Sequence, residues 1–336
     1  MSYKDFFALG ESTVSRFVFW IDTRNIVAGA TDGSENPLTF RFFLGNASST
    51  QHNFIIKVND GRADYAYNPG SQNSIITFAT AGIYKITFVG SSPYILGPGG
   101  TDKNKWIYLD AWGSTFKLGS GSSLTAFPNL EIRFKETLKL SGSRSFFFRS
   151  TKGFSPEFDM SKLDVSDVTN FSGFLSNISL PFYSALNPFI NVATSLSSLY
   201  LNANMASVPK VEIISNTVTD VSSMLSGTGF QGQLIINAPV TNLNSLLEGV
   251  VNPPALGKVN IVNVTNLTGV INQMMSTANV DATLLGWANL DWSNRGTKKS
   301  TYNFYNSKYS NNPEVISAKS FLEGKGLTFA NLTMQT

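Results

Sequence analysis

The 336-residue chain contains no cysteine and a single histidine, His52. The lack of cysteine excludes disulfides, zinc-cysteine sites and thiol nucleophiles. One histidine cannot build a histidine metal cluster, and a serine-histidine-aspartate triad would have to use His52. Because His52 stands between Gln51 and Asn53 at the start of an expected strand, we interpret it as a surface or strand-edge residue.

Charge is also scarce, since Asp, Glu, Lys and Arg make up only 14% of the residues and the net charge is +3. Globular proteins average about 25% charged residues, so this surface must rely on Ser, Thr, Asn and Gly. No Lys/Arg run or basic helix appears, so no nucleic-acid partner is expected. No segment approaches the ~20 apolar residues of a membrane helix, so no membrane insertion is expected.

The first ten residues, Met1 to Gly10, are too short and too acidic for a signal peptide. We therefore expect the chain to remain in the cell that makes it or to leave without a cleaved signal. Release in a virus particle by lysis is one such route.

Short β-branched and aromatic runs dominate the first hundred residues, at 16–22, 38–44, 53–58 and 82–90. Gly, Asn, Asp and Pro turns separate them, which predicts a small β-sandwich over residues 16–96 after an N-terminal arm, 1–15. The segment 76–88, ITFATAGIYKITF, resembles the closing strands of a PKD-like domain. Of that family's Trp-Gly-Asp-Gly turn, only Asp60-Gly61 matches. The resemblance implies a spacer or adhesive sandwich.

An eight-residue pattern recurs through the second half, with copies starting at residues 168, 193, 218, 240 and 264. Steps of 22–25 residues fall within the period of leucine-rich repeats. In each copy the first residue is expected to be buried. Thr follows, and then Asn or Asp offers a side-chain oxygen to cap free amides at a helix start. The next apolar residues fit one face of a short helix or 3₁₀ turn. Strand candidates at 211–214, 233–237 and 258–262 lie between copies. We expect each unit to be strand, loop and short helix, stacked into a solenoid over 161–278.

The segments that carry a family resemblance are 163–171, LDVSDVTNF, and 281–288, 306–310 and 318–329 near the C-terminus. They resemble the BspA-like leucine-rich repeat family, found on bacterial surfaces and in phage-borne proteins. The resemblance implies a C-terminal cap over 279–336 and adhesion or partner recognition without chemistry. The repeats lack the Trp-Asp that follows many family repeats, and carry Leu or Val where Met-Phe is common. Residues 97–160, with the glycine-rich turn at 97–100, are interpreted as linker and N-terminal cap of the solenoid.

The expected fold class is therefore mainly β with short helices, a PKD- or immunoglobulin-like sandwich followed by a leucine-rich-repeat solenoid. The acidic residues do not form a recognisable site. Residues 60–64 lack the ligand spacing of a calcium loop, and Asp164, Asp167 and Asp220 occupy cap and turn positions of the repeats. We predict no catalytic residue, no metal site and no cofactor.

Five aromatic residues near the C-terminus are the candidate ligand- or partner-binding residues, because aromatic side chains are favoured interface anchors. A sugar could stack on Trp292, which stands beside Asp291 and Asn294. The alternative is that these aromatic residues form the core of the C-terminal cap. The candidates are Trp292, Tyr302, Phe304, Tyr305 and Tyr309.

These observations favour a non-enzymatic virion protein, such as a phage fibre, spike or decoration component, that recognises a glycan or protein on the host surface. Its expected partners are other virion proteins and that host surface. A fibre would form a homotrimer, whereas a decoration protein would be monomeric or sit in a ring. The alternative is a bacterial cell-surface adhesin. A polysaccharide-active enzyme, the third hypothesis, needs paired carboxylates on a cleft.

Overall fold

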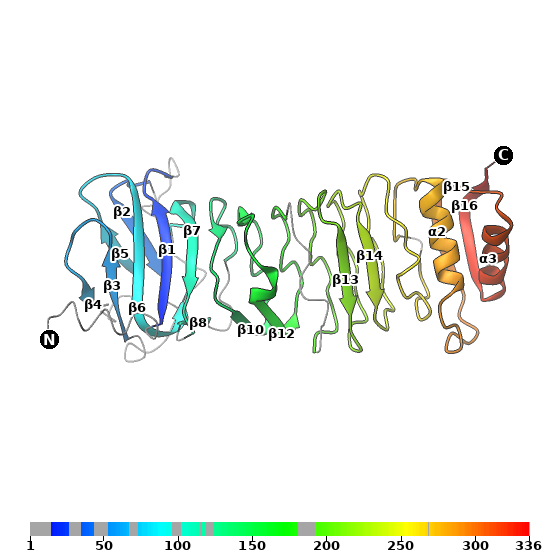
Figure 1. Cartoon of the computed structure of the whole chain (residues 1–336), viewed down its shortest axis with the longest axis horizontal. Helices are drawn as coiled ribbons and strands as arrows, with labels where there is room; N and C mark the ends of the chain where they lie inside the picture. Colours follow the sequence, from blue (N-terminus) through cyan, green and yellow to red (C-terminus); the bar gives the residue numbers. More distant parts are fainter. Residues whose placement is uncertain are drawn as a thin grey trace. The chain divides into compact units, whose positions relative to one another are not determined.

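The computed structural model describes the backbone of most of the chain, and in this part the protein is mainly β, as predicted. The described residues form two α-helices, α2 (Thr277–Ala288) and α3 (Pro313–Gly324) (Figure 1). The chain divides into unit 1, Met1–Leu138 with Ser150–Lys162, and unit 2, Lys139–Arg149 with Leu163–Thr336. His52 and the glycine-rich turn at 97–100 lie outside the described residues, which are 15–26, 35–43, 53–66, 73–95, 102–114, 116–118, 124–180, 192–267 and 269–335.

Unit 1 is built on one large sheet in the order β11-β9-β7-β1-β6-β3-β4, with β8 (Phe116–Leu118) pairing with β6. The predicted runs form β1 (Arg16–Asp22), β3 (Asn53–Val58) and β6 (Ile83–Ile95). Strand β1 pairs antiparallel with β6 on one side and with β7 (Trp106–Trp112) on the other. The short β4 (Tyr65–Ala66) ends the order beside β3.

A second, two-stranded sheet in unit 1 pairs β2 (Thr39–Phe43) with β5 (Asn73–Thr77), antiparallel. Aromatic rings join the faces of the two sheets. The Phe40 ring lies 5.8 Å from that of Phe19 on β1, and the Phe42 ring lies 5.2 Å from that of Phe88 on β6. All four side chains are buried, so these aromatic contacts form the core of unit 1, as the high phenylalanine content suggests.

Parallel pairing is already present within unit 1. Ser92 on β6 pairs in parallel with Phe116 on β8, 24 positions later. Tyr108 on β7 pairs in parallel with Glu131 on β9 (Glu131–Ile132), and Glu131 with Gly153 on β11 (Gly153–Phe154), at spacings of 23 and 22 residues. Strand β7 therefore has one antiparallel and one parallel neighbour. This corrects the predicted boundary at residue 96, because β7 belongs to the large sheet and takes part in the parallel series.

In unit 2, successive copies of the eight-residue pattern are joined by main-chain hydrogen bonds. The amide of Gly173 donates to the carbonyl of Ser197, and the amide of Ser198 donates to that of Ser222, at 3.2 and 2.9 Å. The predicted strands form β13 (Lys210–Ile214) and β14 (Gln233–Asn237), which pair in parallel. The candidate at 258–262 contributes an isolated bridge from Val259 to Ile236. Ahead of the copies, β10 (Leu138–Ser143) pairs with β12 (Leu163–Asn170).

Of the short helix or 3₁₀ turn predicted within each copy, the helix is absent from the described copies that start at 168, 193, 218 and 240, which form consecutive turns closed by hydrogen bonds between residues three apart. The amide of Met224 donates to the carbonyl of Val221, and the amide of Ser226 donates to that of Ser223, both at 3.2 Å. The sixth residue of each of these copies has left-handed backbone geometry, with φ between 53° and 62°, at Gly173, Ser198, Ser223 and Ser245. Because this geometry interrupts helical φ and ψ, the turns cannot extend into a helix.

The third residue of the copies, predicted to cap a helix start, binds the main chain of these turns instead. The side-chain oxygens of Asn170, Asp220 and Asn242 each accept a hydrogen bond from the main-chain amide two residues later, at 2.9–3.1 Å. An Asn or Asp side chain that binds the backbone two residues on mimics a turn. The same oxygen therefore serves a turn here instead of a helix start.

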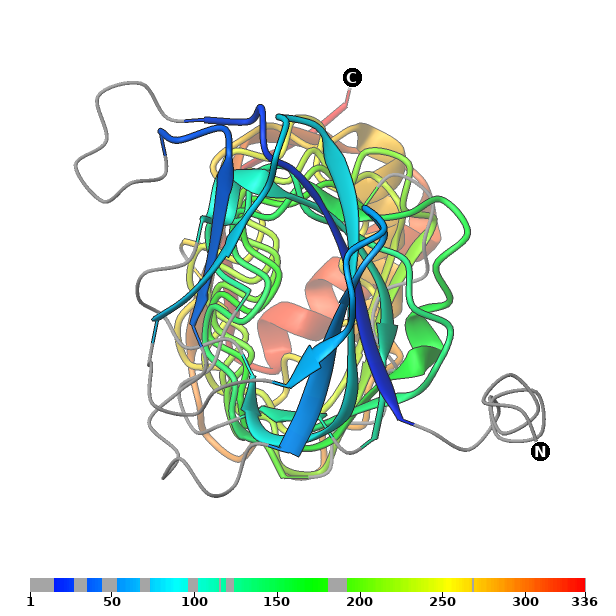
Figure 2. The same cartoon turned by 90° about the vertical axis from the view of Figure 1, so that its left-hand side faces the viewer.

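The C-terminal segment predicted as a cap contains α2, β15 (Ser300–Tyr309), α3 and β16 (Leu327–Met334). Strands β15 and β16 pair in parallel through the α3 crossover, and Leu267 of the last copy bridges to Tyr302 of β15. Figure 2 shows the repeats nearly superposed along the line of view. Ser276 and Asn312 cap the two helices through their side chains.

Candidate functional site

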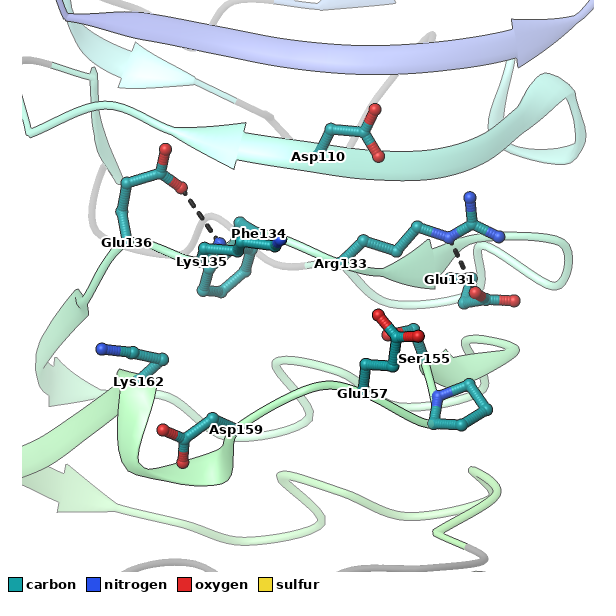
Figure 3. Close-up of a pocket in the computed structure, with 11 residues that line it drawn as sticks. Asp110, Glu131, Arg133, Phe134, Lys135, Glu136, Ser155, Glu157, Asp159 and Lys162 are labelled. Atoms are coloured by element: carbon teal, nitrogen blue, oxygen red, sulfur yellow. Dashed lines mark hydrogen bonds and ion pairs between the residues drawn. The ribbon is translucent and has the colours of Figure 1, made fainter. Parts of the chain in front are cut away.

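A cavity of about 980 Å³ lies in unit 1 (Figure 3). We call it the charged groove, because eight of its 11 lining residues are charged in a chain with only 14% charged residues. This concentration makes it the candidate functional site. The lining residues are Asp110, Glu131, Arg133, Phe134, Lys135, Glu136, Ser155, Pro156, Glu157, Asp159 and Lys162.

The three parallel strands β7, β9 and β11 place these side chains next to one another. The amide of Arg133 donates to the carbonyl of Leu109 at 2.9 Å, and the amide of Ser155 donates to that of Ile132 at 2.8 Å. Asp110, Arg133 and Ser155 therefore lie on neighbouring strands although they are 22–23 positions apart in the sequence. Because the pairing is parallel, the segments that leave the strands all meet at the same edge of the sheet.

An aromatic pair holds the segments that follow β9 and β11. The rings of Phe134 and Phe158 are 5.1 Å apart in an edge-to-face arrangement, and their side chains are 1% and 3% exposed. The 3₁₀ turn η3 (Met160–Lys162) follows. Burial of these rings leaves their charged neighbours, among them Lys135 and Glu157, to line the groove.

Glu131 is a carboxylate of the groove whose charge is balanced by ion pairs. It accepts hydrogen bonds from Arg133 Nε at 2.7 Å and from Lys152 Nζ at 2.9 Å. Burial acts to raise the pKa of this carboxyl, but the hydrogen bonds from Lys152 and Arg133 outweigh burial and hold the pKa below its ordinary value. The Arg133 guanidinium also lies over the Tyr108 ring, 3.3 Å from its centroid. Arg133 is therefore fixed in place by a carboxylate and an aromatic face.

The other charges of the groove form no ion pair with any residue that the structure describes. They do form some hydrogen bonds. Asp110 accepts from the Trp20 indole, and Asp159 accepts from the Ser161 amide at 2.9 Å. Hydrogen bonds from the Ser161 hydroxyl and amide lower the pKa of Asp159. The charges outside ion pairs are Asp110, Glu136, Glu157 and Asp159 on the acidic side and Lys135 and Lys162 on the basic side.

This arrangement is suited to binding through charge and hydrogen bonds. A glycosidase needs one carboxyl that stays protonated, with a raised pKa, beside a second that is ionised. The lowered pKa values of Glu131 and Asp159 keep both carboxyls ionised at neutral pH, which makes them acceptors and not proton donors. In the described part of the chain, no group of three His, Cys, Asp or Glu residues is placed to hold a metal ion.

Three of the five aromatic residues predicted to bind a ligand lie in the core of unit 2, which corrects that prediction. Tyr302 and Phe304 are fully buried on the inner side of β15, and Trp292 is 6% exposed, with its indole nitrogen bound to the Trp287 carbonyl at 2.8 Å. The Tyr302 ring packs edge-to-face on Trp287, with centroids 5.2 Å apart, and burial raises the pKa of Tyr302. The remaining two, Tyr305 and Tyr309, are half-exposed.

Two of the three acidic residues interpreted as caps and turns, Asp164 and Asp220, have such roles in the structure. Asp164 accepts from the Ser166 amide at 3.1 Å. Asp220 accepts from Ser195 Oγ of the preceding copy at 3.0 Å and from Asn242 Nδ2 of the following copy at 2.9 Å. Asp167 differs, since it forms an exposed ion pair with Lys139 at 2.8 Å.

The charged groove was not among the sites predicted from the sequence, although a signal for it is present. Residues 131–136, EIRFKE, contain four charged residues out of six in a chain where charge is rare. The segment 157–162, EFDMSK, contains three. Two charge-rich segments about one repeat period apart indicate a site where repeats stack in parallel.

Comparison with known proteins does not identify a relative. No family model matches the chain, no curated protein matches it, and no solved structure matches it. Among the described residues, no helix is both long and apolar enough to cross a membrane. The function is therefore argued from the fold and the charged groove.

Proposed function

We propose that the chain is a non-enzymatic adhesion or structural protein of a virus particle, a fibre, spike or decoration component that binds the host surface. In this proposal unit 1 is a PKD- or immunoglobulin-like sandwich and unit 2 is a leucine-rich-repeat solenoid of the BspA-like type. The charged groove is its binding site. The expected ligand is a glycan or protein of the host surface, and no cofactor takes part.

The observation that carries the proposal is the run of parallel pairs at intervals of 22–25 residues. It includes Tyr108 with Glu131, Lys210 with Gln233, and Ser195 with Asp220. A stack of short repeats offers an extended surface to a partner while each repeat contacts only its neighbours. An extended surface of this kind suits the binding of a large partner better than catalysis in a single pocket.

The outer surface of the repeats supports a role in recognition. The Thr219 hydroxyl donates to the Thr194 carbonyl of the preceding copy, and the Thr241 hydroxyl donates to that of Thr219, at 3.4 and 3.3 Å. These exposed or half-exposed threonines form one column, and Ser195, Asp220 and Asn242 form the next. Columns of hydroxyl and amide groups, with little charge, suit a protein surface that is exposed to solvent and to polar polymers.

The alternative location is the surface of a bacterium, where a repeat protein would act as an adhesin. A specific observation also keeps the polysaccharide-active enzyme as a second candidate. The charged groove gathers five carboxyl groups, among them Asp110 on β7 and Glu157 in the segment after β11. Hydrolysis would require one of them to donate a proton.

Immunogold electron microscopy tests the proposal, with an antibody against unit 2 applied to phage lysate and to intact cells. Gold on capsid or tail structures is the expected result, and its position separates host recognition at the tail from decoration of the capsid. Gold confined to the cell envelope would replace the proposal by the adhesin. Gold found only within uninfected cells would contradict both.

A further inference from the structure

Most charged side chains that line the charged groove form no ion pair with the residues that the structure describes. Glu131 is satisfied by Arg133 and Lys152. Four carboxylates and two lysines of the lining have no ion-pair partner in the described part of the chain. Lys162 is near enough to Asp159 to help lower the pKa of that carboxyl, although the two form no ion pair. Six charges outside ion pairs around one cavity, in a chain with only 14% charged residues, point to a ligand that pairs with them.

The balance of these charges specifies the sign of that ligand. The unpaired carboxylates are Asp110, Glu136, Glu157 and Asp159, and the unpaired cations are Lys135 and Lys162, which leaves an excess of two negative charges. A polyanion would meet four carboxylates in this cavity. A cation-bearing ligand is therefore favoured by simple electrostatics.

The hydrogen-bonding capacity of the same groups narrows the chemistry further. A carboxylate only accepts hydrogen bonds, whereas an ammonium group only donates them. A ligand that satisfies both must carry donors and acceptors close together, together with positive charge. Sugar hydroxyls donate and accept, and the amine of an amino sugar supplies the charge. The side chains of a lysine-rich peptide bring only donors and leave Lys135 and Lys162 without an acceptor.

Figure 3 shows where such a ligand would lie. Asp110, Arg133 and Glu157 border one half of the cavity, and Glu136, Asp159 and Lys162 border the other. A volume of about 980 Å³ is at the upper end of ordinary ligand sites and has room for several sugar rings. The walls of such sites are usually apolar, so the charged lining here points away from an apolar small molecule.

We propose that the charged groove binds a glycan that carries free, protonated amino groups, through Asp110 and Glu157 on one side and Glu136 and Asp159 on the other. This inference rests on the proposed function and names the ligand class of the same site. Lys135 and Lys162 bind hydroxyl or ring oxygens of the chain. N-acetylation of the sugar, which removes the positive charge, weakens binding.

Isothermal titration calorimetry on the full chain tests this, with a fully de-N-acetylated glucosamine hexamer and its N-acetylated counterpart as probes. We expect the charged hexamer to bind at least about tenfold more tightly, which corresponds to 1.4 kcal/mol, and its binding to weaken as salt is raised. Equal binding of both hexamers, or binding of neither, overturns the proposal. Tighter binding of hexalysine than of the charged hexamer replaces it by a basic-peptide site.

Matched variants separate a role in binding from a role in folding. Glu157→Gln removes a carboxylate that has no partner in the described part of the chain, and we expect about fivefold weaker binding. Lys135→Gln removes an ammonium group that donates to the hydroxyl or ring oxygens, and we expect weaker binding here as well. Glu248→Gln, an exposed carboxylate of unit 2, is the control with the same change in net charge as Glu157→Gln. Unchanged binding by Glu157→Gln, or an equal loss in the Glu248→Gln control, would contradict the assignment.

Failure of the proposed ligand class can be told apart from failure of the proposed function. If both hexamers fail to bind while gold labels the virus particle, only the ligand class is wrong. If the charged hexamer binds and the label stays inside uninfected cells, the ligand class stands and the location is wrong.

Discussion

The guanidinium of Arg295 donates a hydrogen bond to the main-chain carbonyl of Val262 at 3.1 Å, from a side chain that is only 2% exposed. It also binds the carbonyl of Lys325 at 3.0 Å and Ser300 Oγ at 2.8 Å. No carboxylate pairs with Arg295 among the described residues. Carbonyl dipoles from the last repeat and from the end of α3 therefore hold this buried charge, and Arg295 joins the C-terminal cap to the repeats.

Replacing Arg295 by Met is expected to destabilise the cap by about 3 kcal/mol, because buried carbonyls lose their donors. Hydrogen exchange followed by mass spectrometry measures the opening free energy of β15 directly. Lys299→Met, at an exposed neighbouring position, is the control and should leave β15 unchanged. Equal protection of β15 in both variants would show that Arg295 does not hold the cap.

The left-handed residues of the repeats give a second prediction. Ser223 has φ 53°, a geometry that costs an L-residue about 1–2 kcal/mol. Glycine avoids that cost but gains freedom in the unfolded chain, so Ser223→Gly should stabilise unit 2 by up to about 1 kcal/mol. Ser222→Gly, at the preceding position without positive φ, should instead destabilise by about 0.5–1 kcal/mol. The comparison is made by denaturant unfolding, and the same sign for both variants would contradict the backbone argument.

A buried ion pair supports the packing of unit 1. Lys105 Nζ lies 3.0 Å from Asp102 Oδ2, with both side chains at most 3% exposed, and also donates to the carbonyls of Asn36 and Thr39 at 2.8 Å. Asp102→Asn leaves this ammonium group without its carboxylate, which should cost about 3–5 kcal/mol. Unfolding followed by tryptophan fluorescence measures the loss.

The matched variant for this pair is Lys105→Met combined with Asp102→Asn. Replacing both charges removes the need to keep an unpaired ion in the core, so the double variant should lose less stability than Asp102→Asn alone. A double variant that loses the sum of two single effects would contradict the description of Lys105 and Asp102 as one coupled pair.

The pH dependence of stability should show the contribution of Glu131. Its pKa lies below the ordinary value of 4.5, because the hydrogen bonds from Lys152 and Arg133 outweigh the effect of burial. A carboxyl with a lower pKa in the folded state stabilises the fold fully above pH 4.5, and this contribution is lost as the pH falls through the folded pKa. The difference in unfolding free energy between wild type and Glu131→Gln should therefore stay constant above about pH 5 and shrink as the pH falls below about 4.5. A difference that stays constant at lower pH would contradict the ion pairs.

The period and the core positions of the repeats could be predicted from the sequence, because the buried apolar residues recur at the same interval along the chain. The first residue of each copy, such as Val168 and Val218, is fully buried. The choice between a short helix and turns could not be made from the sequence, since apolar residues at positions four, seven and eight fit both. Serine at position six gives no sign of positive φ, whereas glycine, as at Gly173, would.

The charged groove was missed for a related reason. Asp110, Arg133 and Glu157 are separated by 23 and 24 positions in the sequence, and only parallel pairing of β7, β9 and β11 brings them together. The dual role of β7 is equally invisible in its own sequence, because a strand does not encode which neighbour pairs in which direction. The burial of Tyr302 and Phe304 could have been predicted from the sequence, because the two residues alternate with polar residues along β15.

The most direct test of the account is size-exclusion chromatography with light scattering, on the full chain mixed with polysaccharide from the host surface. One measurement reports whether the protein co-elutes with the polymer and whether the polymer keeps its mass. We predict co-elution with a polymer mass that stays constant over time, as expected for a binding protein without turnover. A falling polymer mass would identify an enzyme, and separate elution of protein and polymer would contradict recognition of a surface glycan.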